Sequence, residues 1–347
     1  MKKYFLTLFA ALLLISCGND TTSTFTSVEI TPIFSDSLSV RAIAPQDATK
    51  VWFAANKGIV GLIDGKTPKV ATIKYGDSIL NFRAIAKSGN NVFVLSIENP
   101  AVLYKIKSNG IEAESMEEVY TEEGEGVFYD AITFWNEKEG IAMGDPINGC
   151  LSIIITRDGG NTWNKISCEN LPPVFKGEAA FAASNTNIAV KGDKAWIATG
   201  GKRARIFYTA DKGENWEVFN TPIIQGDVMT GIYSVDFYNE EIGVIVGGNW
   251  EKQDFNEGNK AITRDGGKTW QLLSNGSGPG YRSCIKFIPG TKGKGLIAVG
   301  SPGISYSNDQ GNTWTELSTD GFYTVSFVND SLAFASGRYK ISKLLFR

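Results

Sequence analysis

The chain has 347 residues, 42% of them hydrophobic, with 34 basic and 37 acidic side chains and a formal net charge of −3. This composition supplies enough apolar residues for a folded core, and the mild acidity argues against a nucleic-acid partner. The chain contains no histidine, which excludes a Ser-His-Asp triad, histidine-ligated zinc and histidine–carboxylate iron sites. Glycine-rich nucleotide-binding motifs are also absent, so we expect no cofactor and no metal site.

The first 16 residues have the pattern of a secretory signal peptide. Lys2 and Lys3 precede an apolar run over residues 4–15, followed by the Leu-Ile-Ser-Cys order of a bacterial lipobox ending at Cys17. An uncleaved anchor helix is the alternative, but the run is shorter than the roughly 20 residues needed to span a bilayer. We therefore expect lipidation of Cys17 and attachment to the cell envelope. The outer membrane is favoured, on either its periplasmic or its surface face.

The chain after the signal peptide divides into two parts. Residues 17–26 are expected to form a short polar tether, and residues 27–347 a single monomeric domain. This domain consists of short strands rich in Val, Ile, Phe and Ala, separated by glycine-bearing breaks, and nothing in it has the pattern of a long helix.

Seven short segments of this domain are each the expected first strand of a repeat. They recur about 47 residues apart, which is typical of the blades of a β-propeller. Each precedes a second strand that ends in glycine. The segments are residues 40–43, 82–85, 129–132, 178–181, 233–236, 282–285 and 323–326. We predict an all-β fold, a seven-bladed β-propeller, in which the N-terminal strand at residues 27–33 completes the last blade and closes the ring.

Four of these repeats share a turn with the pattern [ST]-x-D-x-G-x-[TN]-W, whereas the turns at 64–66 and 108–110 lack it. The Asp is expected to accept backbone N–H bonds, the Gly to take a positive φ, and the Trp to begin the return strand and pack inward. The motif resembles the Asp-box, or BNR, repeat. We assign structural rather than catalytic roles to its residues, namely Asp158, Trp163, Asp211, Trp216, Asp265, Trp270, Asp309 and Trp314.

Two cysteines flank the first of these hairpins. If residue 156 faces residue 162 across the turn, Cys150 faces Cys168, and a cross-strand disulfide is predicted, with a free thiol pair as the alternative. Cys284 lies at the start of an apolar strand and is expected to be buried.

The first strand of every propeller blade lines the central channel, so the residues that begin the repeats are expected to converge at one mouth. Arg41 and Arg83 occupy equivalent places in adjacent repeats, and Asp130 has the same place in the third. Inter-blade salt bridges, such as Arg83 with Asp130, are the alternative to ligand binding. The full set of candidate ligand-binding residues is Arg41, Arg83, Tyr129, Asp130, Asp145, Glu178, Arg203, Arg205, Trp250, Tyr281, Arg282 and Tyr323.

Five segments together resemble a bacterial family of Asp-box propellers that is often labelled oxidoreductase or WD40/YVTN/BNR-like. They are residues 128–131, 144–146, 177–184, 199–201 and 280–283. This family is related to the photosystem II assembly-factor propellers and distantly to sialidases. The resemblance covers nearly the whole chain after the signal peptide and implies a seven-bladed propeller with no established reaction.

Three functions remain open on the sequence. The first is an envelope lipoprotein that binds an anionic glycan or peptide, or assists assembly, through its mouth. The second is a sialidase-like glycan hydrolase, in which Arg41, Arg83 and Arg282 would form the arginine triad. In this hypothesis Tyr281 or Tyr323 with Glu178 forms the nucleophile pair, and Asp130 or Asp145 is the acid. The Arg-Ile-Pro signature of sialidases is missing, however. The third is a redox enzyme, as the family label suggests.

Overall fold

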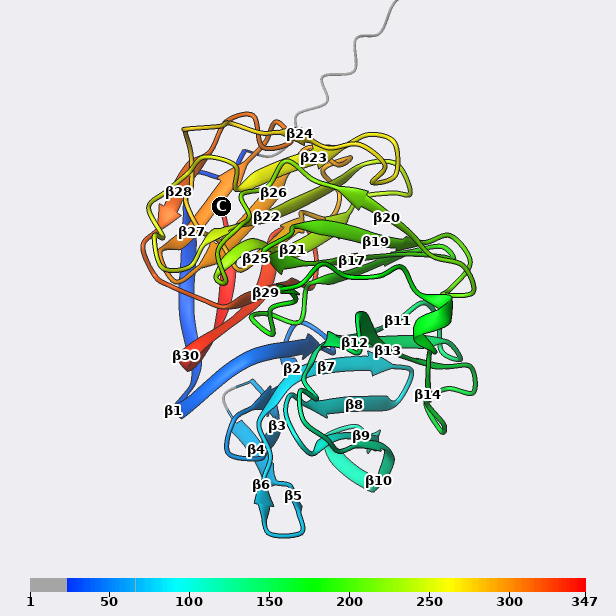
Figure 1. Ribbon diagram of the computed structural model, residues 1–347. Coiled ribbons are helices and arrows are strands. Elements are labelled where there is room, and N and C mark those ends of the chain that lie inside the picture. The colour runs from blue at the N-terminus through cyan, green and yellow to red at the C-terminus, as the bar shows by residue number, and fades with distance from the viewer. Residues whose placement is uncertain (1–23, 66) are drawn as a thin grey trace, which may run out of the picture.

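The computed structural model describes residues 24–65 and 67–347, which form an all-β propeller (Figure 1). The signal peptide and Cys17 lie outside the described residues. Six sheets of four or six strands form the blades, and β5 (Lys74–Tyr75) and β6 (Ser78–Ile79) form a small separate hairpin.

The first blade contains both ends of the described chain. Its strands, in hydrogen-bonded order, are β29 (Thr324–Phe327), β30 (Leu332–Phe346), β1 (Val28–Pro45), β2 (Lys50–Ala55), β3 (Ile59–Asp64) and β4 (Thr67–Thr72). The second blade comprises β7 (Phe82–Ser88), β8 (Asn91–Ser96), β9 (Ala101–Asn109) and β10 (Glu112–Glu122). The third comprises β11 (Tyr129–Phe134), β12 (Gly140–Ile147), β13 (Cys150–Thr156) and β14 (Asn164–Lys165), and is followed by the single-turn 3₁₀ helix η1 (Cys168–Asn170).

The other three blades follow in chain order. The fourth comprises β16 (Ile188–Lys191), β17 (Lys194–Ala198), β19 (Arg205–Thr209) and β20 (Glu217–Asn220). The fifth comprises β21 (Thr230–Phe237), β22 (Gly243–Asn249), β23 (Lys260–Thr263) and β24 (Gln271–Leu272), extended by β15 (Glu178–Ala179) and β18 (Gly200–Gly201). The sixth comprises β25 (Cys284–Phe287), β26 (Leu296–Gly300), β27 (Gly303–Ser307) and β28 (Thr315–Ser318).

The predicted count of seven blades is wrong, because the described strands form six propeller sheets. The reason lies in β1, which is 18 residues long and serves two neighbours. Its first part pairs with β30, where Val28 faces Phe346, and its last part pairs with β2, where Ala44 faces Trp52. The repeats expected as the first and last blades therefore share one continuous sheet. The expected closure by the N-terminal strand is confirmed by the same pairing (Figure 1).

The four shared turns have one hydrogen-bond pattern. At the first, Asp158 Oδ1 accepts the Thr162 N–H at 2.9 Å, and Asp158 Oδ2 accepts the Thr162 hydroxyl at 2.8 Å. Thr156 Oγ1 accepts the Gly160 N–H at 2.9 Å. Gly160 has φ +78°, and an added Cβ would meet the Phe93 ring of the second blade. The equivalent contacts recur at Asp211, Asp265 and Asp309.

Each of these turns ends in a Trp that packs between two neighbouring blades. Trp163 is only 6% exposed and lies against Phe93 of the second blade, with ring centroids 6.2 Å apart. The other three are half-buried, and each donates its indole N–H to a carbonyl of its own turn; they are Trp216, Trp270 and Trp314. The indoles therefore fill the outer part of the blade interfaces.

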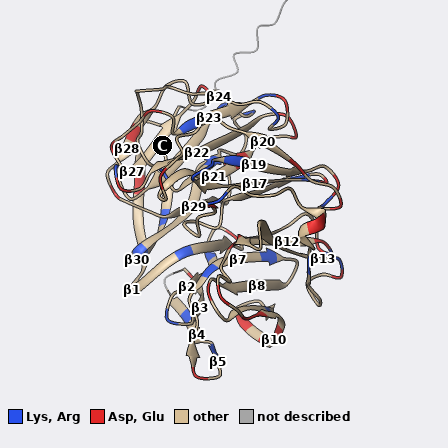
Figure 2. Ribbon diagram, in the orientation of Figure 1, with Lys and Arg blue, Asp and Glu red and all other residues tan. Residues whose placement is uncertain are grey.

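Cys150 and Cys168 form a disulfide with a Cα–Cα distance of 5.5 Å, which connects β13 to η1. Cys284 is buried as a free thiol. Basic and acidic positions are interspersed over strands and loops (Figure 2). Over the part of the chain that the structure describes, no helix has the length and hydropathy of a membrane span.

Candidate functional site

A cavity of about 360 Å³ lies where strands and loops of five blades converge. We call it the mouth cavity. Strand β1 contributes Arg41, β7 contributes Arg83, and β12 contributes Asp145. Loops and strands of the later blades complete the lining with Phe128, Ala179, Ala180, Phe181, Ala182, Ala183, Val228, Met229, Tyr233, Trp250 and Tyr281. Residues far apart in the chain thus meet at one site.

Arg41 is held by contacts that leave part of its guanidinium unsatisfied. The group lies 4.2 Å from the centroid of the Tyr323 ring, a cation–π arrangement. Its Nη1 donates to the Ala183 carbonyl at 3.3 Å, whereas its buried Nε has no partner among the described residues. Tyr323 and Ala183 therefore orient Arg41 without neutralising its charge.

Arg83 is half-buried in the mouth cavity, and no hydrogen bond or ion pair to it is found within residues 24–65 and 67–347. Burial lowers the pKa of its guanidinium, and the nearby charge of Arg41 lowers it further, while Glu98 and Asp130 act in the opposite direction. A bound anion would relieve the repulsion between the two arginines. The pair is therefore suited to a carboxylate or a similar oxyanion.

One wall of the mouth cavity is aromatic. Phe181 and Tyr233 stack face to face, with centroids 4.0 Å apart and planes 2° apart. Tyr281 meets Tyr233 edge to face at 4.8 Å. The Tyr233 hydroxyl donates to the Met229 carbonyl at 3.0 Å, and burial raises the pKa of both tyrosines. These rings are apolar packing surfaces and have no activated phenolate.

Two carboxyl groups lie close to the arginines. Asp145 lines the cavity and accepts the Ala180 N–H at 2.8 Å, and burial raises its pKa. Asp130 is completely buried, and both of its carboxyl oxygens lack a hydrogen-bond partner in the described chain. Burial raises the pKa of Asp130 well above its usual value, the charge of Asp145 adds to this, and Arg83 opposes it. No ion pair joins Arg83 to Asp130 among the described residues, so the expected inter-blade salt bridge is absent there.

Several predicted site residues lie outside the lining of the mouth cavity. Glu178 and Arg205 form a buried bidentate ion pair, with Arg205 Nε donating to Oε1 at 2.9 Å and Nη2 donating to Oε2 at 2.5 Å. Arg203 lies 4.6 Å from the centroid of the Phe175 ring. Arg203, in the loop before β19, and Arg205, the first residue of β19, do not line the mouth cavity, contrary to the prediction that they reach into it.

Strand alternation explains two further departures. Arg282 is buried and donates to the Ser305 hydroxyl at 2.9 Å and to the Tyr281 carbonyl at 2.8 Å. Because it lies one position before the place of Arg41, its side chain points to the other side of the pleat. Tyr129 is fully buried and donates to Glu122 Oε2 at 2.7 Å.

Of the aromatic residues that line the mouth cavity, Trp250 and Tyr281 were predicted from the sequence, whereas Phe128, Phe181 and Tyr233 were not. Phe128, Phe181 and Tyr233 lie in or beside strand-opening segments, where an aromatic ring has the same pattern as a core residue. Val228, which is 71% exposed, and Met229 come from the loop before β21. Apolar residues in a loop before a predicted first strand were the one sequence signal that could have indicated this part of the cavity.

No protein-family model matches the chain. A segment of 66 residues is 39% identical to the photosystem II stability/assembly factor HCF136 of Arabidopsis thaliana, which covers 19% of this chain and 15% of that protein. The chain therefore matches only a small part of this relative's length.

Solved structures cover far more of the chain. A structure described as YCF48 bound to D1 peptide aligns over 93% of this chain and 96% of its own, with a TM-score of 0.67 and 14% identity. YCF48 from Cyanidioschyzon merolae aligns over 92% and 98%, with a TM-score of 0.63 and 13% identity. At these identities the likeness establishes the fold, and the chain has a propeller fold related to that of the YCF48 and HCF136 assembly factors.

Proposed function

We propose that this protein is a non-catalytic binding protein whose mouth cavity binds a carboxylate on a peptide, in the manner of an assembly factor. The observation that carries the proposal is Arg83, a half-buried guanidinium in the cavity with no protein partner among the described residues. Arg41 beside it and the aromatic wall formed by Phe181, Tyr233 and Tyr281 supply a second cation and an apolar surface.

The likeness to YCF48 supports a peptide as the ligand class, because one of the similar structures contains a bound D1 peptide. The hydrolase alternative lacks support at its nucleophile. Glu178 is held by Arg205, by the Thr199 hydroxyl at 2.7 Å and by the Phe175 N–H at 2.9 Å. No hydrogen bond joins Glu178 to Tyr281 or Tyr323 in the described chain. Anionic glycans remain a second ligand class that the same experiment distinguishes.

Replacing Arg83 by alanine is expected to weaken binding about tenfold to a hundredfold, because a charge-assisted hydrogen bond contributes roughly 1.5 to 3 kcal/mol. The melting temperature is expected to stay nearly constant, since Arg83 has no partner to lose. A thermal-shift screen of carboxylate-bearing peptides and acidic glycans, followed by calorimetric titration of the best compound, measures both quantities.

The matched control is Arg203→Ala, an exposed arginine outside the mouth cavity, which is expected to bind as wild type does. If Arg83→Ala binds the selected compound as tightly as wild type, the mouth cavity is not the site. If only acidic glycans bind, the peptide part of the proposal fails and the anion part stands.

We also propose that the protein is attached to the bacterial outer membrane through a lipid on Cys17, on the basis of the lipobox-like order that ends at this residue. Metabolic labelling with a palmitate analogue in the native host is expected to mark the wild type and not Cys17→Ala. Equal labelling of both proteins would contradict the lipid anchor.

A further inference from the structure

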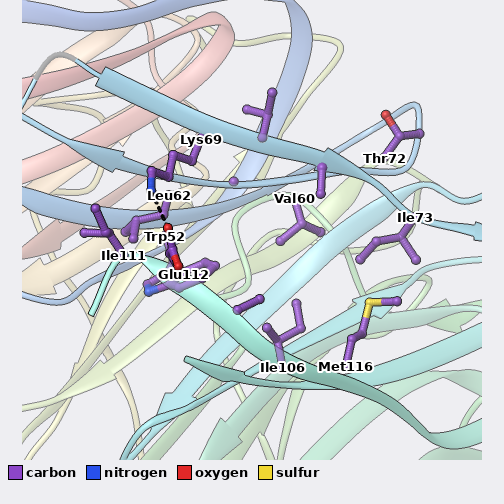
Figure 3. Close-up of a pocket in the computed structure, with 14 residues that line it drawn as sticks. Trp52, Val60, Leu62, Lys69, Thr72, Ile73, Ile106, Ile111, Glu112 and Met116 are labelled. Carbon is purple, nitrogen blue, oxygen red and sulfur yellow. Dashed lines mark hydrogen bonds and ion pairs between the residues drawn. The ribbon is translucent and has the colours of Figure 1, made fainter. Parts of the chain in front are cut away.

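A second cavity, of about 400 Å³, lies at the rim between the first and second blades. We call it the rim cavity. The first blade contributes Trp52, Val60 and Leu62, and the second contributes Ile106 and Met116 (Figure 3). One ion pair, Lys69 Nζ to Glu112 Oε1 at 3.4 Å, connects β4 with β10 beside these apolar side chains. The mouth cavity shares no lining residue with it.

The other five blade interfaces each hold an aromatic ring supplied from outside the four-stranded core of the blade. In four of them the ring is the indole that follows a shared turn, and in the fifth, between the sixth and first blades, it is Phe25 from the N-terminal segment. The rings are Trp163, Trp216, Trp270, Trp314 and Phe25. Phe25 lies 5.1 Å from Tyr306 and 5.3 Å from Phe346, measured between ring centroids.

The interface between the first and second blades holds Tyr75 of the separate β5–β6 hairpin but lacks an indole, because the turn after β9 is short. Ser108-Asn109-Gly110 replaces the eight-residue motif, and Ile111 then immediately precedes β10, which begins with Glu112 and Ala113. Trp52 lines the rim cavity and belongs to the same buried cluster as Phe82 and Tyr104. Its indole N–H donates to Gln46 Oε1 at 3.3 Å.

Apolar side chains around the rim cavity are open to solvent. Val70 is 54% exposed, Met116 is 49% exposed and Ile111 is 37% exposed. β4 and β10 beside the cavity are both edge strands, since β4 pairs only with β3 and β10 only with β9. Free strand edges are able to accept an extended peptide, which then presents alternate side chains to neighbouring pockets.

The charge of β10 restricts what can bind there. Its sequence, EAESMEEVYTE, contains five glutamates and no basic residue, and its first seven positions are exposed. Lys69 and Lys107 neutralise Glu112 and Glu114, respectively. The exposed carboxylates of Glu117 and Glu118 then remain to attract a basic partner.

We propose that the rim cavity binds the indole of a tryptophan in an extended, basic segment of a partner polypeptide. The indole occupies the place that the protein's own tryptophans fill at four other interfaces, and lysines or arginines beside it face the β10 carboxylates. This binding is independent of the anion proposed for the mouth cavity, because the two sites take ligands of opposite charge.

The test uses the full chain and the blocked peptide Lys-Trp-Lys carrying a 5-fluorotryptophan, observed by ¹⁹F NMR. The fluorine signal is expected to shift saturably on titration, and Lys-Ala-Lys, added as a competitor, is expected not to displace the probe. Met116→Asp is expected to weaken binding at least about tenfold, because it places a charge against the indole. Glu-Trp-Glu is expected to bind several-fold more weakly than Lys-Trp-Lys.

Ile79→Asp is the matched control, since Ile79 is 69% exposed on the β5–β6 hairpin and does not line the rim cavity. Its affinity for the probe should equal that of wild type. Met116 is exposed, so its substitution is expected to leave the melting temperature unchanged, and Ile111→Asp repeats the test at a second position. The proposal is overturned if Lys-Trp-Lys does not bind, if Lys-Ala-Lys displaces it equally well, or if neither substitution weakens binding. Self-association that Met116→Asp abolishes would assign the rim cavity to a second copy of this chain instead.

Discussion

Replacing Trp163 by alanine is expected to lower the free energy of unfolding by about 3 to 5 kcal/mol, the usual cost of a cavity left by a buried Trp. Trp163 is 6% exposed and packs edge to face on Phe93 and Phe134, at centroid distances of 6.2 and 5.7 Å. Its indole N–H has no hydrogen-bond partner among the described residues. The loss therefore measures packing alone, and Trp163→Phe is expected to restore much of it.

Two controls separate this packing from the presence of a Trp as such. Trp314→Ala removes a half-buried indole from an equivalent turn and is expected to cost less than Trp163→Ala. Trp250 lines the mouth cavity and is 46% exposed, so Trp250→Ala should change stability little. Urea denaturation followed by circular dichroism gives the three values. Equal losses at Trp163 and Trp250 would show that the indole between the second and third blades contributes no packing.

Replacing Glu178 by alanine is expected to cost about 3 to 5 kcal/mol, because it leaves the Arg205 guanidinium buried without a counter-ion. Arg205 is 6% exposed and Glu178 is 3% exposed, and the remaining acceptor for Arg205 is the Pro173 carbonyl at 2.9 Å. The Phe175 N–H loses its acceptor in the same variant, and the Thr199 hydroxyl keeps only the longer contact to the Arg205 carbonyl at 3.2 Å. One substitution therefore leaves a buried guanidinium without its counter-ion and disturbs two further hydrogen bonds.

The double variant Glu178→Leu with Arg205→Met is the control for this ion pair. Removing both charges together is expected to be much less destabilising than removing either one, since no isolated charge remains in the interior. Thermal and urea unfolding of the two single variants and the double variant complete the cycle. If the losses at Glu178 and Arg205 simply add, the two side chains do not act as a pair.

The sequence predicted the parts of the fold that depend on local patterns. Strand length, repeat spacing and the Asp158-type turn are fixed by residues close together in the chain, and each has a recognisable pattern. The blade count was wrong because it depends on how β1 divides its pairing between β30 and β2, which no local pattern of residues 28–45 expresses.

The candidate site likewise combines residues that repeat symmetry predicts with contacts that depend on the tertiary fold. Arg41 and Arg83 hold equivalent places in adjacent repeats and do meet in the mouth cavity, because repeat symmetry places them there. Glu178 and Arg205 look like equally suitable site residues in the sequence, but in the structure they form an ion pair with each other. Such a pairing depends on the tertiary fold and has no local sequence pattern. The rim cavity was beyond prediction for a different reason: it arises from the absence of an indole after Gly110, and its shape depends on the neighbouring blade.

The pairing of Val28 with Phe346 has a consequence for how the protein is made. A ribosome delivers the N-terminal half of β1 first and its partner strand in β30 last, so the first blade stays incomplete until synthesis ends. The second, third and sixth blades each draw on one consecutive stretch of chain, and the fourth and fifth together draw on another, because β15 and β18 interleave with the strands of the fourth. These blades are able to fold vectorially while the rest is still being translated. The contact between the two ends has the greatest sequence separation in the described fold, and such contacts slow folding. Until it forms, a nascent chain presents the unpaired N-terminal part of β1, which makes the last step of biogenesis the one most exposed to misassociation.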